Sequence, residues 1–198
     1  MENKSSNGWK FFALLFGGLL AALVGLYIYK QQNPDLKVIV TGCLAERYRS
    51  QIEEEIPEVD AVVGCASNKA IDTIVARLFH GENHLESYGA KKDFPLGGKR
   101  VIGTPAHYAY LKIAEGCNNR CHYCAIPGIR GPLRSREMAD CVAEARWLAG
   151  EGVKELIIVA QDPTAYGEDW GKPGSICELL DKLNRIDGIQ WIRIMYAY

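Results

Sequence analysis

Three cysteines crowd into the stretch Cys-Asn-Asn-Arg-Cys-His-Tyr-Cys, at Cys117, Cys121 and Cys124. Thiolates at these spacings on one loop can converge on a single metal centre, and such soft ligands select zinc, copper(I) or an iron–sulfur cluster. Structural zinc sites normally use two separated short ligand pairs, and this stretch has no second pair, while His122 is poorly placed to complete a tetrahedron. The cysteine triad therefore favours a four-iron cluster whose fourth iron is open to an exchangeable ligand, with zinc and accidental clustering as alternatives.

An α/β pattern surrounds this cysteine triad. Tyr108 to Ala114 alternates like a strand and leads directly into it. Beyond the triad, we expect a helix over 135–148 with Ser135 as its N-cap, a strand over 156–160, a helix over 175–186 and a strand starting at Trp191. Strands that alternate with helices predict a parallel sheet. Three strands cannot close a barrel, so we expect a core that is truncated in its third strand.

A smaller α/β pattern precedes the core. Strands are expected over 37–41 and 61–63, and helices over 45–55 and 68–80, the latter followed by Gly81. Residues 81–107 are rich in Gly, Lys and Pro and are typical of an interdomain linker. The predicted organisation is a tail over 1–10, an uncharged helix over 11–29, a partial α/β domain over 30–80, the linker over 81–107 and the core over 108–198.

The segment 11–29 holds no charged residue, and Lys10 and Lys30 bracket it. As a helix it would span roughly 28 Å, close to one hydrocarbon core, which predicts a transmembrane anchor. A signal peptide or a buried core helix is the alternative interpretation. Lys30, Lys37, Arg47 and Arg49 slightly outnumber the preceding lysines, which favours a cytoplasmic C-terminal side.

The composition is close to that of an ordinary globular protein, with 198 residues, 48% hydrophobic and 24% charged positions and a net charge of −1. It excludes a disordered chain and a small disulfide scaffold. Near-neutral charge argues against a general polyanion binder. Four arginines near the triad could meet an acidic substrate or RNA, or could form a solvated surface. They are Arg120, Arg130, Arg134 and Arg136. Cys141 and Cys177 border apolar helix stripes and are interpreted as packing residues.

The spacing Cx3Cx2C after a first strand resembles the radical S-adenosylmethionine (SAM) superfamily. HYAYLKIAEGCNNRCHYCAIPGIRGPLRSRE, over 107–137, resembles the methylthiotransferases of that superfamily, and VTGCLAERY, over 40–48, resembles their N-terminal domain. AQDPTAYG, over 160–167, resembles the branch that acts on ribosomal protein uS12 (RimO type), whereas the tRNA-modifying branch typically has GQNVNSYG there. The resemblance covers 37–198.

The resemblance implies a role for each matching residue. Cys117, Cys121 and Cys124 would hold the [4Fe-4S] cluster that cleaves SAM. Tyr123 would lie along the adenine of SAM, and Gln161 and Asp162 near its amino group. The implied reaction inserts a methylthio group at the β-carbon of an aspartate of uS12. An unactivated C–H bond is broken by a radical that the cofactor supplies and the protein positions.

Cys43 would be one of three ligands to the family's auxiliary [4Fe-4S] cluster. The other two ligands lie N-terminal to this position in the family, and here no cysteine precedes Cys43. Cys65 is a conceivable substitute without precedent in the family. The later barrel strands and the family's C-terminal RNA-binding-type domain are also absent. We therefore expect that the auxiliary cluster does not assemble and that the active site is incomplete.

Three hypotheses follow. The first is a radical SAM methylthiotransferase that acts on uS12, in contact with the small ribosomal subunit and served by an electron donor such as flavodoxin or ferredoxin. The second keeps this chemistry with a tRNA adenosine as substrate. The third is a non-catalytic, membrane-tethered iron–sulfur fragment. Such clusters require reducing conditions, so the catalytic portion is expected in the cytoplasm.

Overall fold

The computed structural model describes residues 24–98 and 100–197. The chain divides into two compact units. The first comprises the described residues up to Val63 together with Ala70–Ser87, and the second comprises Gly64–Lys69 together with the residues from Tyr88 onwards. Both units are of the α/β class, as the alternating pattern predicted.

The first unit is built on a parallel three-stranded sheet in the order β1-β2-β3. Its strands are β1 (Ile39–Thr41), β2 (Ala61–Val63) and β3 (Leu85–Ser87). The helix α4 (Ile71–Phe79) buries Ile74 and Leu78 against β2 and β3. The sequence pattern had not indicated β3, which lies within the range expected to be a linker.

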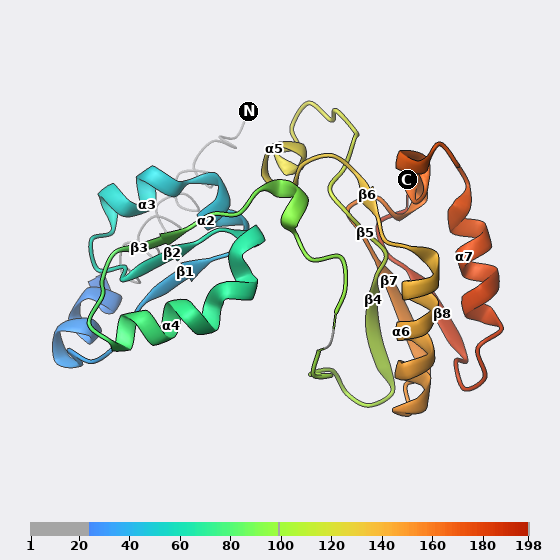
Figure 1. The fold of residues 1–198 in the computed structure, drawn as a ribbon, viewed down its shortest axis with the longest axis horizontal. Helices are drawn as coiled ribbons and strands as arrows, with labels where there is room; N and C mark the ends of the chain where they lie inside the picture. The colour runs from blue at the N-terminus through green and yellow to red at the C-terminus, as the bar shows by residue number, and fades with distance from the viewer. Residues whose placement is uncertain (1–23, 99, 198) are drawn as a thin grey trace, which may run out of the picture. The chain divides into compact units, whose positions relative to one another are not determined.

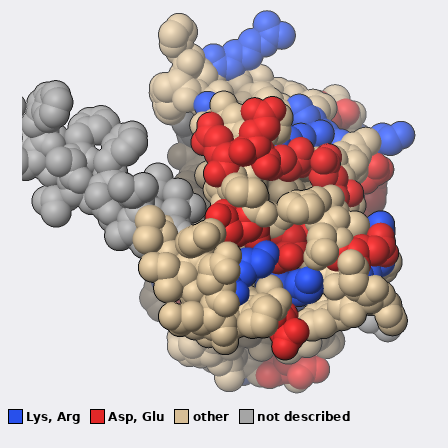
Figure 2. All heavy atoms as spheres, turned by 90° about the vertical axis from the view of Figure 1, so that its left-hand side faces the viewer, with Lys and Arg blue, Asp and Glu red and all other residues tan. Residues whose placement is uncertain are grey.

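The segment 45–55 forms two short helices where one was expected. α2 (Cys43–Arg47) ends at Tyr48, whose backbone, at φ −118° and ψ 39°, leaves the helical region, and α3 (Arg49–Glu55) begins directly after it. Both helices pack against β2. α3 ends in three exposed glutamates at 53–55, and acidic side chains are numerous on the face of the molecule shown in Figure 2.

The transmembrane helix predicted over 11–29 requires correction. Among residues 24–98 and 100–197, no helix combines the length and the apolar character that a bilayer span needs, which overturns that prediction. Residues 24–32 are helical, and Lys30 donates from Nζ to Asp60 Oδ2 at 2.6 Å. The lysine that brackets the uncharged segment on its C-terminal side is therefore paired with a carboxylate of the protein. Positions 11–23 lie outside the described residues.

The second unit contains a parallel sheet in the order β4-β7-β8. Its strands are β4 (Tyr108–Lys112), β7 (Glu155–Val159) and β8 (Trp191–Ile194). The helices α6 (Met138–Gly150) and α7 (Ser175–Asn184) pack on one face of this sheet and on each other (Figure 1). The core consists of fully buried residues from these strands and helices, including Leu111, Leu148, Leu156, Leu179 and Leu183.

A small antiparallel pair stands at the carboxyl end of β4, where β5 (Ala114–Glu115) pairs with β6 (Arg134–Ser135). The helix α5 (Ile126–Arg130) lies between these two strands in the chain. The prediction that Ser135 is the N-cap of the following helix was wrong. Instead its Oγ accepts the N–H of Gly167 at 2.8 Å, and α6 begins at Met138 without a side-chain cap.

Candidate metal and cofactor site

The cysteine triad lies on a loop whose two ends are joined. This cysteine loop, residues 116–133, runs between β5 and β6 at the carboxyl edge of the sheet. Cys117 N–H donates to Gly131 O at 3.1 Å, and Leu133 N–H donates to Asn118 Oδ1 at 3.0 Å. Gly116 has φ +79°, and a Cβ there would stand 2.1 Å from Pro132 O. Any other residue at 116 would force the two ends of the loop apart.

The three thiols differ in exposure. Cys117 and Cys121 are partly buried, Cys124 is exposed, and none of the described cysteines forms a disulfide bond. Asn119 N–H donates to Cys117 Sγ at 3.4 Å, and Cys124 N–H donates to Cys121 O at 3.0 Å. Within the described residues, no three His, Cys, Asp or Glu side chains stand close enough together to hold a metal ion. Three thiols on one loop are nevertheless a donor set that fits an iron–sulfur cluster. The assignment of Cys117, Cys121 and Cys124 as its ligands stays a prediction.

A second loop, residues 160–167, follows β7, the neighbour of β4 in the sheet. Asp162 is buried and accepts hydrogen bonds from Thr164 N–H and Oγ1 and from Asn119 Nδ2, the last at 2.8 Å. Asn119 therefore links the cysteine loop to the loop after β7. The carboxyl ends of two adjacent parallel strands carry both segments, which is where α/β sheets bind ligands.

Gln161 carries a polar atom that the described part of the protein leaves unsatisfied. Its Oε1 is buried and has no hydrogen-bond partner among the described residues. A buried acceptor without a donor is costly, and a bound molecule that carries an amino group would satisfy it. This orphaned oxygen fits the predicted position near the amino group of SAM. Tyr123, the residue expected at the adenine, is 87% exposed.

Comparison with known proteins shows what the chain is similar to. Residues 111–196 match the sequence model of the radical SAM superfamily. Three similar proteins are each named ribosomal protein uS12 methylthiotransferase RimO. The one from Acetivibrio thermocellus is 47% identical over 86% of this chain, and those from Clostridioides difficile and Aquifex aeolicus are 48% and 47% identical over 81% and 82%. The chain therefore contains a radical SAM region and is similar, over more than four-fifths of its length, to proteins named as methylthiotransferases. It covers 39%, 36% and 34% of the lengths of these relatives.

One buried carboxylate beside the cysteine loop was not predicted from the sequence. Glu115 is fully buried two residues before Cys117, and it binds Lys112 and Arg130, the latter through Oε1 at 2.8 Å. Burial by itself raises the pKa of Glu115, but the hydrogen bonds and charges of Lys112 and Arg130 outweigh it and lower the pKa below its ordinary value. Glu115 is therefore an ionised structural group.

The arginines near the triad bind within the unit. Arg134 donates to Phe94 O at 3.0 Å, and Arg136, only 8% exposed, binds Glu144. With Arg130 bound to Glu115, three of the four arginines that could have met a substrate or RNA have partners inside the protein. Their positive charge is evident in the sequence, but their partners are not, because these lie up to 42 residues away in the chain.

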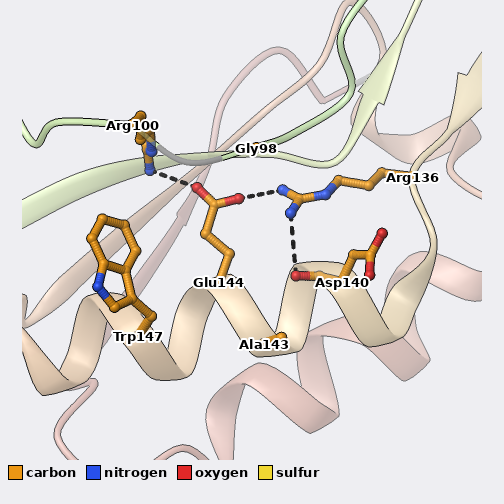
Figure 3. A pocket seen from close by; sticks show the side chains of 7 residues that line it. All are labelled: Gly98, Arg100, Arg136, Asp140, Ala143, Glu144 and Trp147. Atoms are coloured by element: carbon orange, nitrogen blue, oxygen red, sulfur yellow. Dashed lines mark hydrogen bonds and ion pairs between the residues drawn. The ribbon is translucent and has the colours of Figure 1, made fainter.

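A pocket of about 670 Å³ lies beside α6, away from the cysteine loop, and Figure 3 shows its lining. Glu144 stands at its centre between two guanidinium groups, with Arg100 Nη2 at 2.9 Å and Arg136 on the other side. Trp147 and Asp140 line the same pocket. The two arginines are neutralised within the pocket wall, and none of the residues predicted to bind the cofactor lines it.

The remaining cysteines take different positions. Cys43 opens α2 directly after Gly42, whose φ is +95°, and Cys65 opens the 3-10 helix Cys65–Ala70 after β2. Cys141 is fully buried in the core, as expected, and burial raises its pKa to about 11. Cys177 is exposed, so the prediction that it packs in the core was wrong. It lies on the face of α7 opposite the buried Leu179 and Leu183 stripe.

Proposed function

We propose that this chain carries the SAM-cleaving portion of a methylthiotransferase that modifies ribosomal protein uS12. The observation that carries the proposal is the cysteine triad at the carboxyl edge of β4, within a sequence about 47% identical to proteins named for that activity. The orphaned Gln161 Oε1 on the adjacent loop supports a bound SAM. By its similarity to these proteins, the chain is assigned to the transferases.

Different residues would hold the cluster, bind SAM and fix the loop after β7. Cys117, Cys121 and Cys124 would hold the cluster, which when bound supplies the electron that cleaves SAM to a carbon radical able to take hydrogen from an unactivated C–H bond. Gln161 Oε1 would accept from the SAM amino group. Asp162 is already held by Thr164 and Asn119, so we assign it the role of fixing the loop that carries Gln161.

The proposed substrate rests on the name that the similar proteins share. We propose an aspartate of uS12, modified at its β-carbon, as the acceptor, and the small ribosomal subunit as the partner. A low-potential donor such as flavodoxin or ferredoxin would supply the electron. The exposed glutamates of α3 weigh against a tRNA substrate on that face, because they repel phosphate. A reducing compartment such as the cytoplasm suits the described cysteines, which form no disulfide bond.

Anaerobic reconstitution of the 198-residue chain with iron and sulfide tests the proposal. We expect about four irons per chain, held by the triad. With dithionite, the loaded chain should convert SAM to 5′-deoxyadenosine, and Cys124→Ser should abolish this conversion. Mass spectrometry of uS12 and tRNA from cells that lack the gene would then assign the substrate. Zinc without iron, or iron without SAM cleavage, would contradict the proposal.

Cys43 adds one further expectation. With no cysteine before it, we propose that the chain assembles the triad's cluster alone. About eight irons per chain would contradict this and would require other ligands beside Cys43. Mössbauer spectroscopy of wild type and Cys43→Ala would separate the two outcomes, because only an auxiliary cluster would be lost from the variant.

A further inference from the structure

Glu115 is a buried carboxylate that directly precedes the cysteine loop. Its side chain is fully buried, and each of its two oxygens has a cationic partner. Lys112, the last residue of β4, binds Oε2, and Arg130, the last residue of α5, binds Oε1 at 2.8 Å. The carboxylate therefore joins a residue that precedes the triad to a residue that follows it.

The same two cations hold a third segment. Residues 91–97, here called the strap, run past the cysteine loop within the second unit. Lys112 Nζ also donates to Pro95 O at 2.8 Å, and the Arg130 guanidinium lies 5.7 Å from the centre of the Phe94 ring. Phe94 itself is buried. Strand end, helix α5 and strap therefore meet at one carboxylate.

A buried carboxylate with two cationic partners fixes the positions of those partners more than it adds to the net stability of the fold. Removing a carboxylate from water is unfavourable, and its ion pairs offset that cost only when their geometry is well defined. An apolar side chain of similar size at 115 would fill the same space without joining the two ends of the loop. The ion pairs of Glu115 with Lys112 and Arg130 therefore fix the position of α5 relative to the end of β4.

The part of the loop that needs positioning contains two of the three thiols. Cys121 and Cys124 lie between the base of the loop and α5, which begins two residues after Cys124. The base is fixed by Cys117 and Gly131. Arg130 fixes the end of α5 to Glu115. The stretch that carries Cys121 and Cys124 is thereby anchored on both sides.

We propose that Glu115 is a positioning residue that, through Lys112 and Arg130, holds α5 so that Cys121 and Cys124 meet the metal centre together with Cys117. The inference rests on the proposed function, because it assumes that the triad holds a cluster. It predicts that loss of the carboxylate's charge alters the cluster while the second unit stays folded.

The test compares Glu115→Gln with Glu144→Gln in the full chain. Glu144 is the matched control, since it also bridges two cations in the same unit, Arg100 and Arg136, but belongs to α6 and not to the surroundings of the cysteine loop. After anaerobic reconstitution, a chelator should remove iron from Glu115→Gln on the order of tenfold faster than from wild type. The electron paramagnetic resonance spectrum of its reduced cluster, and the change that SAM causes in it, should also differ. Glu144→Gln should match wild type in both measurements.

A second variant keeps the test decisive if Glu115→Gln fails to fold. Arg130 is 26% exposed, so Arg130→Gln removes one partner near the surface and should reproduce the faster iron loss. The double variant should be no worse than the more severe single variant, because both act through one contact. Wild-type iron retention and spectra in Glu115→Gln and Arg130→Gln would overturn the inference alone. A wild type that binds no iron would overturn the proposed function instead.

Discussion

Replacement of Tyr166 by phenylalanine tests how the loop after β7 is held. Tyr166 is fully buried, and its hydroxyl donates to the backbone oxygen of Arg136 at 2.7 Å. This bond ties the end of the loop that carries Gln161 to the chain just beyond β6. Burial, together with the neighbouring Cys141, raises the pKa of Tyr166 well above its ordinary value, so the hydroxyl stays a donor at all relevant pH.

The magnitude follows from what the substitution removes. Phenylalanine keeps the ring and its edge-on contact with Trp170, whose centroid lies 5.2 Å away, so the change opens little space. It leaves the buried Arg136 oxygen without its donor, which costs about 1–3 kcal/mol. Each kcal/mol should lower the melting temperature by about 2–4 °C in a protein of this size.

Urea unfolding followed by tryptophan fluorescence measures this loss. Three of the chain's four tryptophans, Trp147, Trp170 and Trp191, lie in the second unit, so a change in their emission reports that unit. Tyr110→Phe is the control, because Tyr110 is 43% exposed and its substitution should change the free energy of unfolding by less than about 0.5 kcal/mol. If Tyr166→Phe is as stable as this control, packing alone holds the loop and our reasoning is refuted.

Three further predictions concern other parts of the chain. Cys141, with its pKa raised to about 11, is roughly 0.1% thiolate at pH 8, so iodoacetamide should leave it unmodified in the folded chain while labelling the exposed Cys124, as peptide mass spectrometry would reveal. The pKa of Asp60 is lowered because Lys30 and a backbone N–H outweigh the effect of burial, so its contribution is present above about pH 4 and is lost as pH falls below that. Lys30→Met should therefore cost about 1–2 kcal/mol of unfolding free energy at pH 7 and much less at pH 3, and an equal cost at both pH values would contradict the pairing. Cys117→Ala should reduce reconstituted iron from about four per chain to near zero by colorimetric assay, and retention of iron would remove Cys117 from the ligand set.

The local sequence predicted the class of the fold and the family. Apolar runs alternating with amphipathic helices predicted the parallel sheets, and β2 was predicted with its observed bounds, Ala61–Val63. The spacing of Cys117, Cys121 and Cys124 indicated the chemistry, because ligand type and spacing are properties of neighbours in the chain. The same local view failed at Tyr48, where one residue leaves the helical region and divides a predicted helix.

Tertiary structure decided the partners of the polar residues. Ser135 looked like a helix cap, but folding brings Gly167 to its hydroxyl, 32 residues away. Lys30 looked like the edge of a membrane anchor, but its partner Asp60 lies 30 residues further along the chain. Glu115 carried no motif at all. Periodicity reports which face of an element is apolar, whereas the pairing of a charge depends on which distant segment the fold places beside it. For this protein, the local pattern predicted most of the strands and helices and a metal-binding loop, and only the folded chain shows which distant groups hold that loop in position.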